Sequence, residues 1–368
     1  MTCCGLLFGL PAAAQTAQPQ TNIYAKFRDD INKNVVTIIS SEPKGGFVFS
    51  AHDIAAVFER KTDMRVIPMV GQGGAQNVKD VLYLRGVDMG IMHPHVIKYY
   101  DQNGLIGPEV AKRIAYITLL FTDELHVVVR PEIKSFDDLR GKRINFSNNG
   151  SSTQIAMRLI FKAMKMKVEE LNMGQADAFE MMKRGELDAT TCACSKPLRS
   201  VRTPLTGSGF KFLTVPHTNE LKDVFLPGSL TSSDYPELIP AGQNIDTIAI
   251  QTILGVYNWK STTTPRYRKI SDFVRTFFDN VEEFGKRPRQ PQWRPIDVAA
   301  NIKGLQRFGP AQDWLAKRAT TVATKLKPAS GTPSAQRQAA SAAPSSPADQ
   351  AKLFRQFLNW VKQQPQRQ

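Results

Sequence analysis

The sequence is poor in the residues that bind metals or cross-link small secreted domains. It has four cysteines and five histidines among 368 residues. No Cys, His, Asp or Glu cluster has the spacing of a metal site, so His93-Pro94-His95 is expected to line a cleft rather than hold a metal ion. The chain also lacks any run of about 18 consecutive apolar residues, which excludes a transmembrane helix.

The usual signatures of catalysis and cofactor binding are missing as well. Residues 71–74 have two of the glycines of a dinucleotide fingerprint, but Asn77 stands where the third is needed. No phosphate-binding loop, nucleophile elbow, kinase motif set or pair of carboxylates is present. Ser195 and Lys196 are adjacent, but adjacency does not make a Ser–Lys dyad. We therefore expect a protein without cofactor or metal that is not an enzyme.

The cysteines fall into two pairs. Cys3 and Cys4 lie in an N-terminal segment that we expect to be removed. Cys192 and Cys194 are two residues apart, so on a strand they share a face. A disulfide between them would close a very tight ring. Free thiols or small buried hydrophobic side chains are therefore favoured over a redox pair.

The charge balance is basic, with a formal net charge of +15. Lys and Arg are spread along the chain and are most frequent in its C-terminal third. No basic recognition helix, zinc-finger spacing or aromatic RNA-binding motif accompanies them, so nucleic acid is not an expected partner. The excess is interpreted as a solvated basic surface.

Both ends of the chain differ in composition from the middle. Residues 1–14 have the apolar stretch and the small-residue cleavage pattern of a remnant signal peptide, and residues 15–34 form a polar leader. Residues 326–350 are rich in Ala, Ser, Pro and Gln, which predicts a disordered linker. Residues 351–368 carry one apolar stripe and predict a C-terminal amphipathic helix. That helix is expected to dock on the body, with a partner or a membrane surface as alternatives.

Between these ends the pattern alternates strand, turn and helix, which favours a mainly parallel sheet covered on both faces. The 42% hydrophobic content is enough to form two hydrophobic cores. The section after residue 245 is expected to return and complete the first lobe, and residues 226–243 are predicted to be irregular. Strands are predicted at 35–39, 65–70, 88–92, 125–129, 141–146, 187–192 and 248–259, and helices at 51–58, 75–85, 134–139, 155–163, 176–184 and 270–284.

Three polar, glycine-containing turns each follow a strand and precede a helix. They contain Gly45-Gly46, Gly73-Gly74 and Gly150-Ser151-Ser152-Thr153. In open α/β sheets ligands bind outside the carboxyl ends of the strands, and helix N-termini favour anions. Two turns in one lobe and one in the other therefore predict a ligand cleft between lobes. Its expected ligand-binding residues are Gly45, Gly46, Phe47, Gly73, Gly74, His93, Ser151, Ser152, Thr153 and, for an anionic group, Lys196.

Two segments give the chain a family resemblance. Residues 123–130 (DELHVVVR) followed by 135–143 (SFDDLRGKR) are similar to the "EELHVVVR … LADLKGKRV" segment of the TAXI-type solute-binding proteins of TRAP transporters. Gly45-Gly46, Gly73-Gly74, residues 88–92 and residues 185–189 add weaker matches, and the resemblance extends from about residue 35 to about residue 314. It implies an α/β, two-lobed periplasmic-binding-protein (type II-like) fold with a hinge and a central ligand cleft. Lobe I would comprise 35–124 plus 245–325, and lobe II 125–244.

The same resemblance implies a periplasmic protein that delivers an organic anion or an amino acid to TRAP membrane subunits. Where that family has Gly-Gly-x-Tyr-Tyr, this chain has Gly45-Gly46-Phe47-Val48-Phe49, so two phenol hydroxyls are missing. His93 replaces a common Gln at a strand end. A more apolar acid is therefore expected as ligand. A binding protein for an ABC importer or an envelope sensor is the alternative, followed by an enzyme on the same scaffold and an envelope protein that acts through its C-terminal helix.

Overall fold

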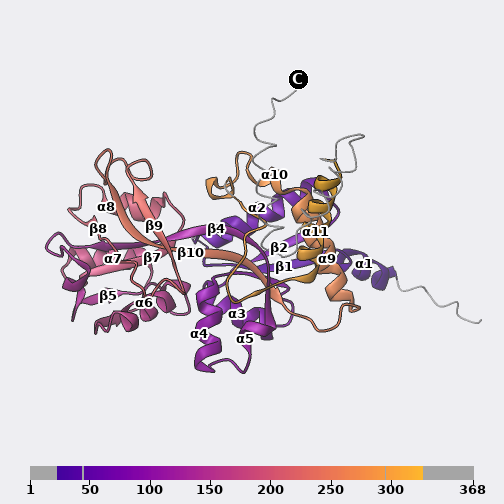
Figure 1. Cartoon of the computed structure of the whole chain (residues 1–368), viewed down its shortest axis with the longest axis horizontal. Coiled ribbons are helices and arrows are strands. Elements are labelled where there is room, and N and C mark those ends of the chain that lie inside the picture. The colour runs from indigo at the N-terminus through magenta and orange to yellow at the C-terminus, as the bar shows by residue number, and fades with distance from the viewer. Residues whose placement is uncertain (1–22, 44, 295, 326–368) are drawn as a thin grey trace, which may run out of the picture.

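The computed structural model describes residues 23–43, 45–294 and 296–325, and Figure 1 shows their arrangement. The strands of these residues form one mixed, 11-stranded sheet that extends through two lobes. Its main path runs in the order β2-β1-β3-β10-β4-β7-β5-β6. The remnant signal peptide, the first part of the leader, the linker and the C-terminal helix predicted from the sequence lie outside the described residues.

Lobe I is built on three parallel strands, β1 (Val35–Ile39), β2 (Arg65–Met69) and β3 (Met89–Met92). The helices after β1 and β2 are those that the periodicity predicts, because apolar residues recur at helical spacing after the two glycine turns. The helices after β3 were not predicted from the sequence. In chain order the helices are α2 (Gly46–Lys61), α3 (Gly74–Tyr83), α4 (Pro94–Asn103) and the short α5 (Val110–Arg113).

Two long strands connect the lobes: β4 (Ile114–Val129) and β10 (Asn244–Tyr257), which are antiparallel neighbours. One end of β10 pairs with β3 of lobe I, and its other end pairs with β9 (Leu226–Thr231) of lobe II. The C-terminal part of β4 pairs with β7 (Ala189–Cys194). Figure 1 shows both strands running from one lobe into the other, so they are the connection about which the lobes can bend. The predicted lobe boundary at 124/125 falls within β4.

Lobe II repeats the parallel arrangement on a smaller scale. Strands β5 (Arg143–Asn145), β6 (Glu169–Leu171) and β7 are parallel, and β4 extends them antiparallel. The 3-10 turn η1 (Phe136–Leu139) precedes β5, and β8 (Lys211–Phe212) pairs with β4. The helices are α6 (Ser152–Ala163), α7 (Gln175–Lys183) and α8 (Arg199–Leu205).

The chain then returns to lobe I, as the sequence predicts. Helix α9 (Pro265–Asp279) has its phenylalanines buried in the same apolar cluster as the inner face of α2, where Phe58 stacks on Phe273 at 4.7 Å between ring centroids. The remaining elements of this section are α10 (Val281–Phe284), η2 (Pro291–Trp293), β11 (Gln306–Arg307) and α11 (Gly309–Lys325).

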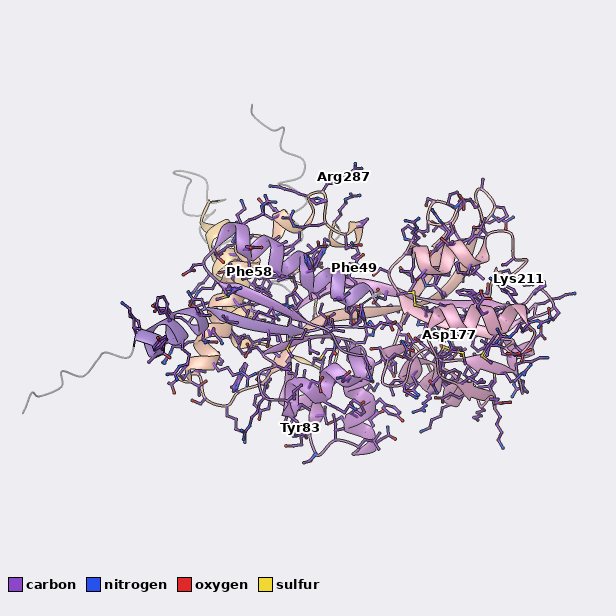
Figure 2. All side chains as sticks on the ribbon, turned by 180° about the vertical axis from the view of Figure 1, so that it is seen from behind. Phe49, Phe58, Tyr83, Asp177, Lys211 and Arg287 are labelled. Carbon is purple, nitrogen blue, oxygen red and sulfur yellow. A yellow bond between two sulfur atoms is a disulfide. The ribbon has the colours of Figure 1, made fainter. Side chains whose placement is uncertain are left out.

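Each lobe has apolar cores of its own. Val36, Phe58 and Phe273 belong to one cluster of lobe I, while Phe146 and Phe161 belong to a cluster of lobe II. Figure 2 shows Phe58 in the interior of lobe I and Lys211 at the far end of lobe II. A further cluster joins the two lobes, because Ile155 of α6 is buried among apolar residues of lobe I. The cores within each lobe let it stay intact when the connecting strands bend. None of the helices in the described part combines the length and apolar character needed to cross a bilayer.

The structure corrects two predictions about elements and adds a helix. The polar leader, for which the sequence predicts no element, forms the helix α1 (Ile23–Asn32) in its second half. Residues 226–243 include strand β9, which pairs with β10 through six residues from Leu226 to Thr231. The sheet is mixed rather than mainly parallel, because the crossing strands run against both parallel groups.

Candidate functional site

A cleft of about 360 Å³ lies between the lobes, and the ten residues chosen from the sequence all line it. Lobe I supplies the turns before α2 and α3 and the end of β3. Lobe II supplies the start of α6 and the segment after β7. The predicted residues found at the cleft are Gly45, Gly46, Phe47, Gly73, Gly74, His93, Ser151, Ser152, Thr153 and Lys196. Their role in binding a ligand stays a prediction.

Helices α2 and α3 begin at the cleft with glycine at the N-cap. Gly45 and Gly73 have no side chain to cap the helix, although the Ser41 hydroxyl accepts the Val48 N–H of α2 at 3.2 Å. Gly73 has φ of 115°, a conformation that L side chains rarely adopt. Since the first N–H groups of a helix have no intrahelical acceptor, both starts present donors and positive potential toward the cleft.

Helix α6 brings a third N-terminus from the opposite lobe. The Ser151 hydroxyl caps it by accepting the Gln154 N–H at 3.2 Å. The Thr153 hydroxyl accepts the Ala193 N–H at 3.0 Å and so ties the helix to β7. Ser152 Oγ is buried and has no hydrogen-bond partner. Two lobes therefore direct helix starts at one cleft, which is an arrangement that suits an anionic group.

The lobes already touch beside the cleft. The Gln76 N–H donates to Gly150 O at 3.2 Å, and the Asn148 amide donates to Glu42 Oε2 at 2.9 Å. A Cβ on Gly74 would overlap Ser152 Oγ, so the contact of α3 with α6 requires glycine there. In this conformation the two faces of the cleft are therefore in contact.

A buried polar network forms the floor of the cleft. His93 Nε2 lies 3.1 Å from Asp123 Oδ2 and 3.0 Å from Thr252 Oγ1, and the Thr252 hydroxyl donates to the same carboxylate at 2.9 Å. Ser195 donates to Asp123 Oδ1 at 2.6 Å. Because the neighbours of His93 Nε2 accept, this nitrogen carries the proton, while His93 Nδ1 is buried and has no partner.

His95 lies next to this polar network. Its Nε2 donates to Ser152 O at 3.0 Å, and its ring stacks on His93 with centroids 5.3 Å apart. Burial lowers the pKa of His95 to about 3, so it is neutral at pH 7. No group of three or more His, Cys, Asp and Glu side chains in the described residues is arranged to hold a metal ion.

Lys196 lines the cleft, but its charge is already neutralised. Its ammonium lies 3.1 Å from Asp234 and 3.7 Å from Glu124, and it donates to Ser229 O. Burial raises the pKa of Glu124 to about 7, against the opposing effect of Lys196. The exposed Arg199, at the start of α8, is the other cationic side chain among the described lining residues.

Ser195 and Lys196 do not form a catalytic pair. The Ser195 hydroxyl donates to Asp123, and the Lys196 ammonium is held by Asp234. A serine nucleophile needs a neighbouring base that accepts its proton and is itself oriented toward a substrate. Here the hydroxyl holds a buried carboxylate in place, which is a structural role.

The structure contradicts the prediction of free thiols at positions 192 and 194. Cys192 and Cys194 share a face of β7, as predicted, but their sulfur atoms are joined in a disulfide. Their Cα atoms are 5.6 Å apart, within the range that disulfides span, so closing the ring needs no displacement of the strand. Figure 2 shows the yellow bond at the end of lobe II that faces lobe I.

Sequence reasoning missed two groups of lining residues. Asp123 and Glu124 interrupt a largely apolar strand, and carboxylates in such a run signal buried, partnered charges. Gln290 and Gln292 reach the cleft from the segment around η2. No sequence signal marks them, because only the return of the chain to lobe I brings them there.

Comparisons with known proteins gave one family match and several similar solved structures. The profile of the NMT1-like family matches residues 42–300. Among solved structures, the chain is similar to MatC from Rhodopseudomonas palustris with bound malate, at 15% identity and a TM-score of 0.43, covering 70% of this chain and 92% of that one. A TctC solute-binding protein from Polaromonas matches at 15% identity and a TM-score of 0.39, covering 68% and 88%. The effector-binding domain of QuiR in complex with shikimate matches at 12% identity and a TM-score of 0.39, covering 65% and 93%.

Proposed function

Since the chain belongs to the NMT1-like family, we propose that it is a solute-binding protein that captures a small organic anion or amino acid between its lobes. The observation that carries the proposal is the meeting of three helix N-termini from both lobes at one cleft. Each helix start stabilises a nearby anion by about 0.3–1 kcal/mol, and more when the site is partly buried.

The residues that line the cleft favour a ligand with one carboxylate and an otherwise apolar structure. Phe47 lies edge-on to His93 with ring centroids 5.2 Å apart, and Phe49 is 47% exposed at the cleft. In Figure 2, Phe49 lies at the end of α2 that faces lobe II. A second carboxylate would face Asp123 and Glu42, while Lys196 is already paired. An aromatic or branched monocarboxylate therefore fits better than a dicarboxylate.

Capture proceeds by closure about β4 and β10. The starts of α2 and α3 belong to lobe I and the start of α6 to lobe II, so a carboxylate meets all three only when the lobes approach. A ligand shifts the population toward the closed form by its differential affinity for that form. Ser152 Oγ and His93 Nδ1 are buried without partners, and they are the polar atoms that we assign to the ligand. The Ser152 hydroxyl can donate to the carboxylate, whereas His93 Nδ1, which carries no proton, can only accept from a donor group such as the ammonium of an amino acid.

We also propose that the protein acts in the periplasm and delivers its ligand to TRAP membrane subunits. The similarity of residues 123–130 and 135–143 to TAXI-type proteins supports it. A neighbouring gene for a large multi-span permease is the expected context. A neighbouring histidine kinase or an ATPase pair would instead favour the sensor or ABC-importer alternative.

A thermal-shift screen of the full chain tests the binding function. We expect a rise in melting temperature with benzoate-type or branched-chain monocarboxylates, and a smaller rise with succinate or malate at the same concentration. The matched variant is Ser152→Ala, which loses the hydroxyl assigned to the ligand without breaking a hydrogen bond of the ligand-free protein, so its rise in melting temperature should be smaller. If no carboxylate or amino acid stabilises purified, ligand-free protein, the proposal is wrong.

A further inference from the structure

The disulfide Cys192–Cys194 lies in the wall of the cleft, where a solute would be in contact with it. Both residues line the cleft and are partly exposed, in contrast to the buried residues that precede them on β7. Between them, the Ala193 N–H donates to Thr153 in the first turn of α6. The positive end of that helix therefore lies beside the pair, and a helix N-terminus stabilises thiolates.

His126 adds a hydrogen-bond donor on one side of this disulfide. The Leu198 N–H donates to Tyr235 Oη at 2.9 Å, and the Tyr235 hydroxyl donates in turn to His126 Nε2 at 2.7 Å. The proton of the neutral ring is thereby fixed on Nδ1, which donates to Glu124 O at 2.9 Å and lies 3.4 Å from Cys194 Sγ. Burial lowers the pKa of His126 to about 4, so the ring remains neutral at pH 7.

From this geometry we propose that the cleft contains a thiol–disulfide exchange site for small thiols, with Cys192 as the sulfur that is attacked and Cys194 as the leaving sulfur. The proposal rests on the proposed function only in that the cleft admits a solute-sized molecule. The asymmetry comes from His126. Its single Nδ1 proton is donated to Glu124 O and also lies within reach of Cys194 Sγ at 3.4 Å, so a thiolate on Cys194 shares this proton, and a better-stabilised thiolate leaves faster.

The exchange balances in two steps. A thiolate RS⁻ attacks Cys192 Sγ, the Cys192–Cys194 bond breaks, and Cys194 leaves as a thiolate that takes a proton from solvent. A second thiolate attacks the sulfur of R in the mixed disulfide, which releases RSSR and leaves Cys192 as a thiolate that is protonated in turn. The small thiol is oxidised, and the protein disulfide is reduced to two thiols.

Mass spectrometry of the full chain tests the direction of attack. Oxidised protein is mixed with reduced glutathione at pH 7.5, quenched with N-ethylmaleimide after short times, and digested with trypsin. The peptide 185–199 contains Cys192 and Cys194, whereas Cys3 and Cys4 fall in the peptide that ends at Lys26. We expect glutathione on Cys192 and maleimide on Cys194, in an excess of about ten to one over the reverse pattern.

The same reaction in 8 M urea is the matched control, because unfolding removes His126 and the α6 start from the pair. The preference for Cys192 should fall to near equality there. Equal labelling of the two sulfurs in folded protein, no adduct before unfolding, or free thiols in protein purified without reductant would each overturn the inference.

A Cys192→Ser/Cys194→Ser variant separates this inference from the proposed function. We expect it to retain the thermal shift with monocarboxylates, because neither sulfur is among the polar atoms assigned to the ligand. Failure of exchange with an intact thermal shift contradicts only the exchange site, whereas selective exchange without any carboxylate shift contradicts only the proposed ligand class.

Discussion

At the scale of single residues, Glu124 makes the stability of the protein depend on pH. Its side chain is 13% exposed, and burial raises the pKa of its carboxyl in the folded state to about 7 from the ordinary value of 4.5. Between these values the folded state binds the proton and the unfolded chain does not, so this group lowers stability as pH rises from about 4.5 to 7. Replacement by the neutral Gln removes the dependence.

We therefore expect Glu124→Gln to gain stability relative to the wild type as pH rises from 5 to 7.5, by about 2 kcal/mol. Urea unfolding of both proteins across this range measures the difference. Taking the difference between the two proteins cancels the contribution of His126, whose lowered pKa makes the free energy of unfolding rise with pH. Glu59→Gln, on the exposed face of α2, is the control and should show no such trend. A constant difference between wild type and Glu124→Gln would contradict the burial effect.

Prediction from the sequence succeeded for features that depend only on residues adjacent in the chain. Glycine turns such as Gly45-Gly46 and Gly73-Gly74 mark helix starts, and the strand–turn–helix order places those starts at one sheet edge. The partners of Lys196 could not be predicted, because Asp234 and Glu124 approach it only through the tertiary fold. The disulfide was missed because the predicted ring strain was given more weight than the short Cα separation that β7 provides.

At the scale of elements, helix α9 depends on its cap. The Thr264 hydroxyl accepts the Tyr267 N–H at 3.2 Å, and the helix buries Phe273 and Phe277 in the core of lobe I. Thr264→Ala should reduce the free energy of unfolding by about 1 kcal/mol, and Thr264→Ser should restore most of it. Chemical denaturation measures both, with the exposed Thr262→Ala as the control. An equal loss in Thr264→Ser would show that the methyl group, rather than the cap, matters.

Element types were predictable where one periodicity dominates. Residues 35–39 and the apolar spacing after residue 46 gave a strand and a helix close to those observed. The length of β4 was not predictable, because residues 114–121 are apolar except for Thr118 and have no alternation to mark a strand. Strand β9 contains Pro227 and Gly228, which argue against a strand, yet pairing with β10 stabilises it.

At the scale of the whole molecule, each lobe has a core of its own, and the lobes are joined by β4 and β10 and by the packing of α6 against lobe I. A small change at the contact between lobes should therefore alter closure more than folding. Gly74 and Gly46 offer a matched pair, because each is the first residue of a helix at the cleft and neither has a positive φ. A Cβ on Gly74 would overlap Ser152 Oγ, whereas a Cβ on Gly46 would meet nothing within 4 Å.

Gly74→Ala should accordingly hold the lobes apart. An overpacked contact costs about 1–3 kcal/mol, and the hinge relieves it by opening, so ligand affinity should fall by about tenfold to a hundredfold. Small-angle scattering should show a larger radius of gyration for Gly74→Ala than for the wild type, with the melting temperature of the ligand-free protein nearly unchanged. Gly46→Ala should match the wild type in shape, because its Cβ meets no other atom in the ligand-free protein. If the two variants behave alike, the contact of α3 with α6 does not control closure, and the cleft must close through other surfaces.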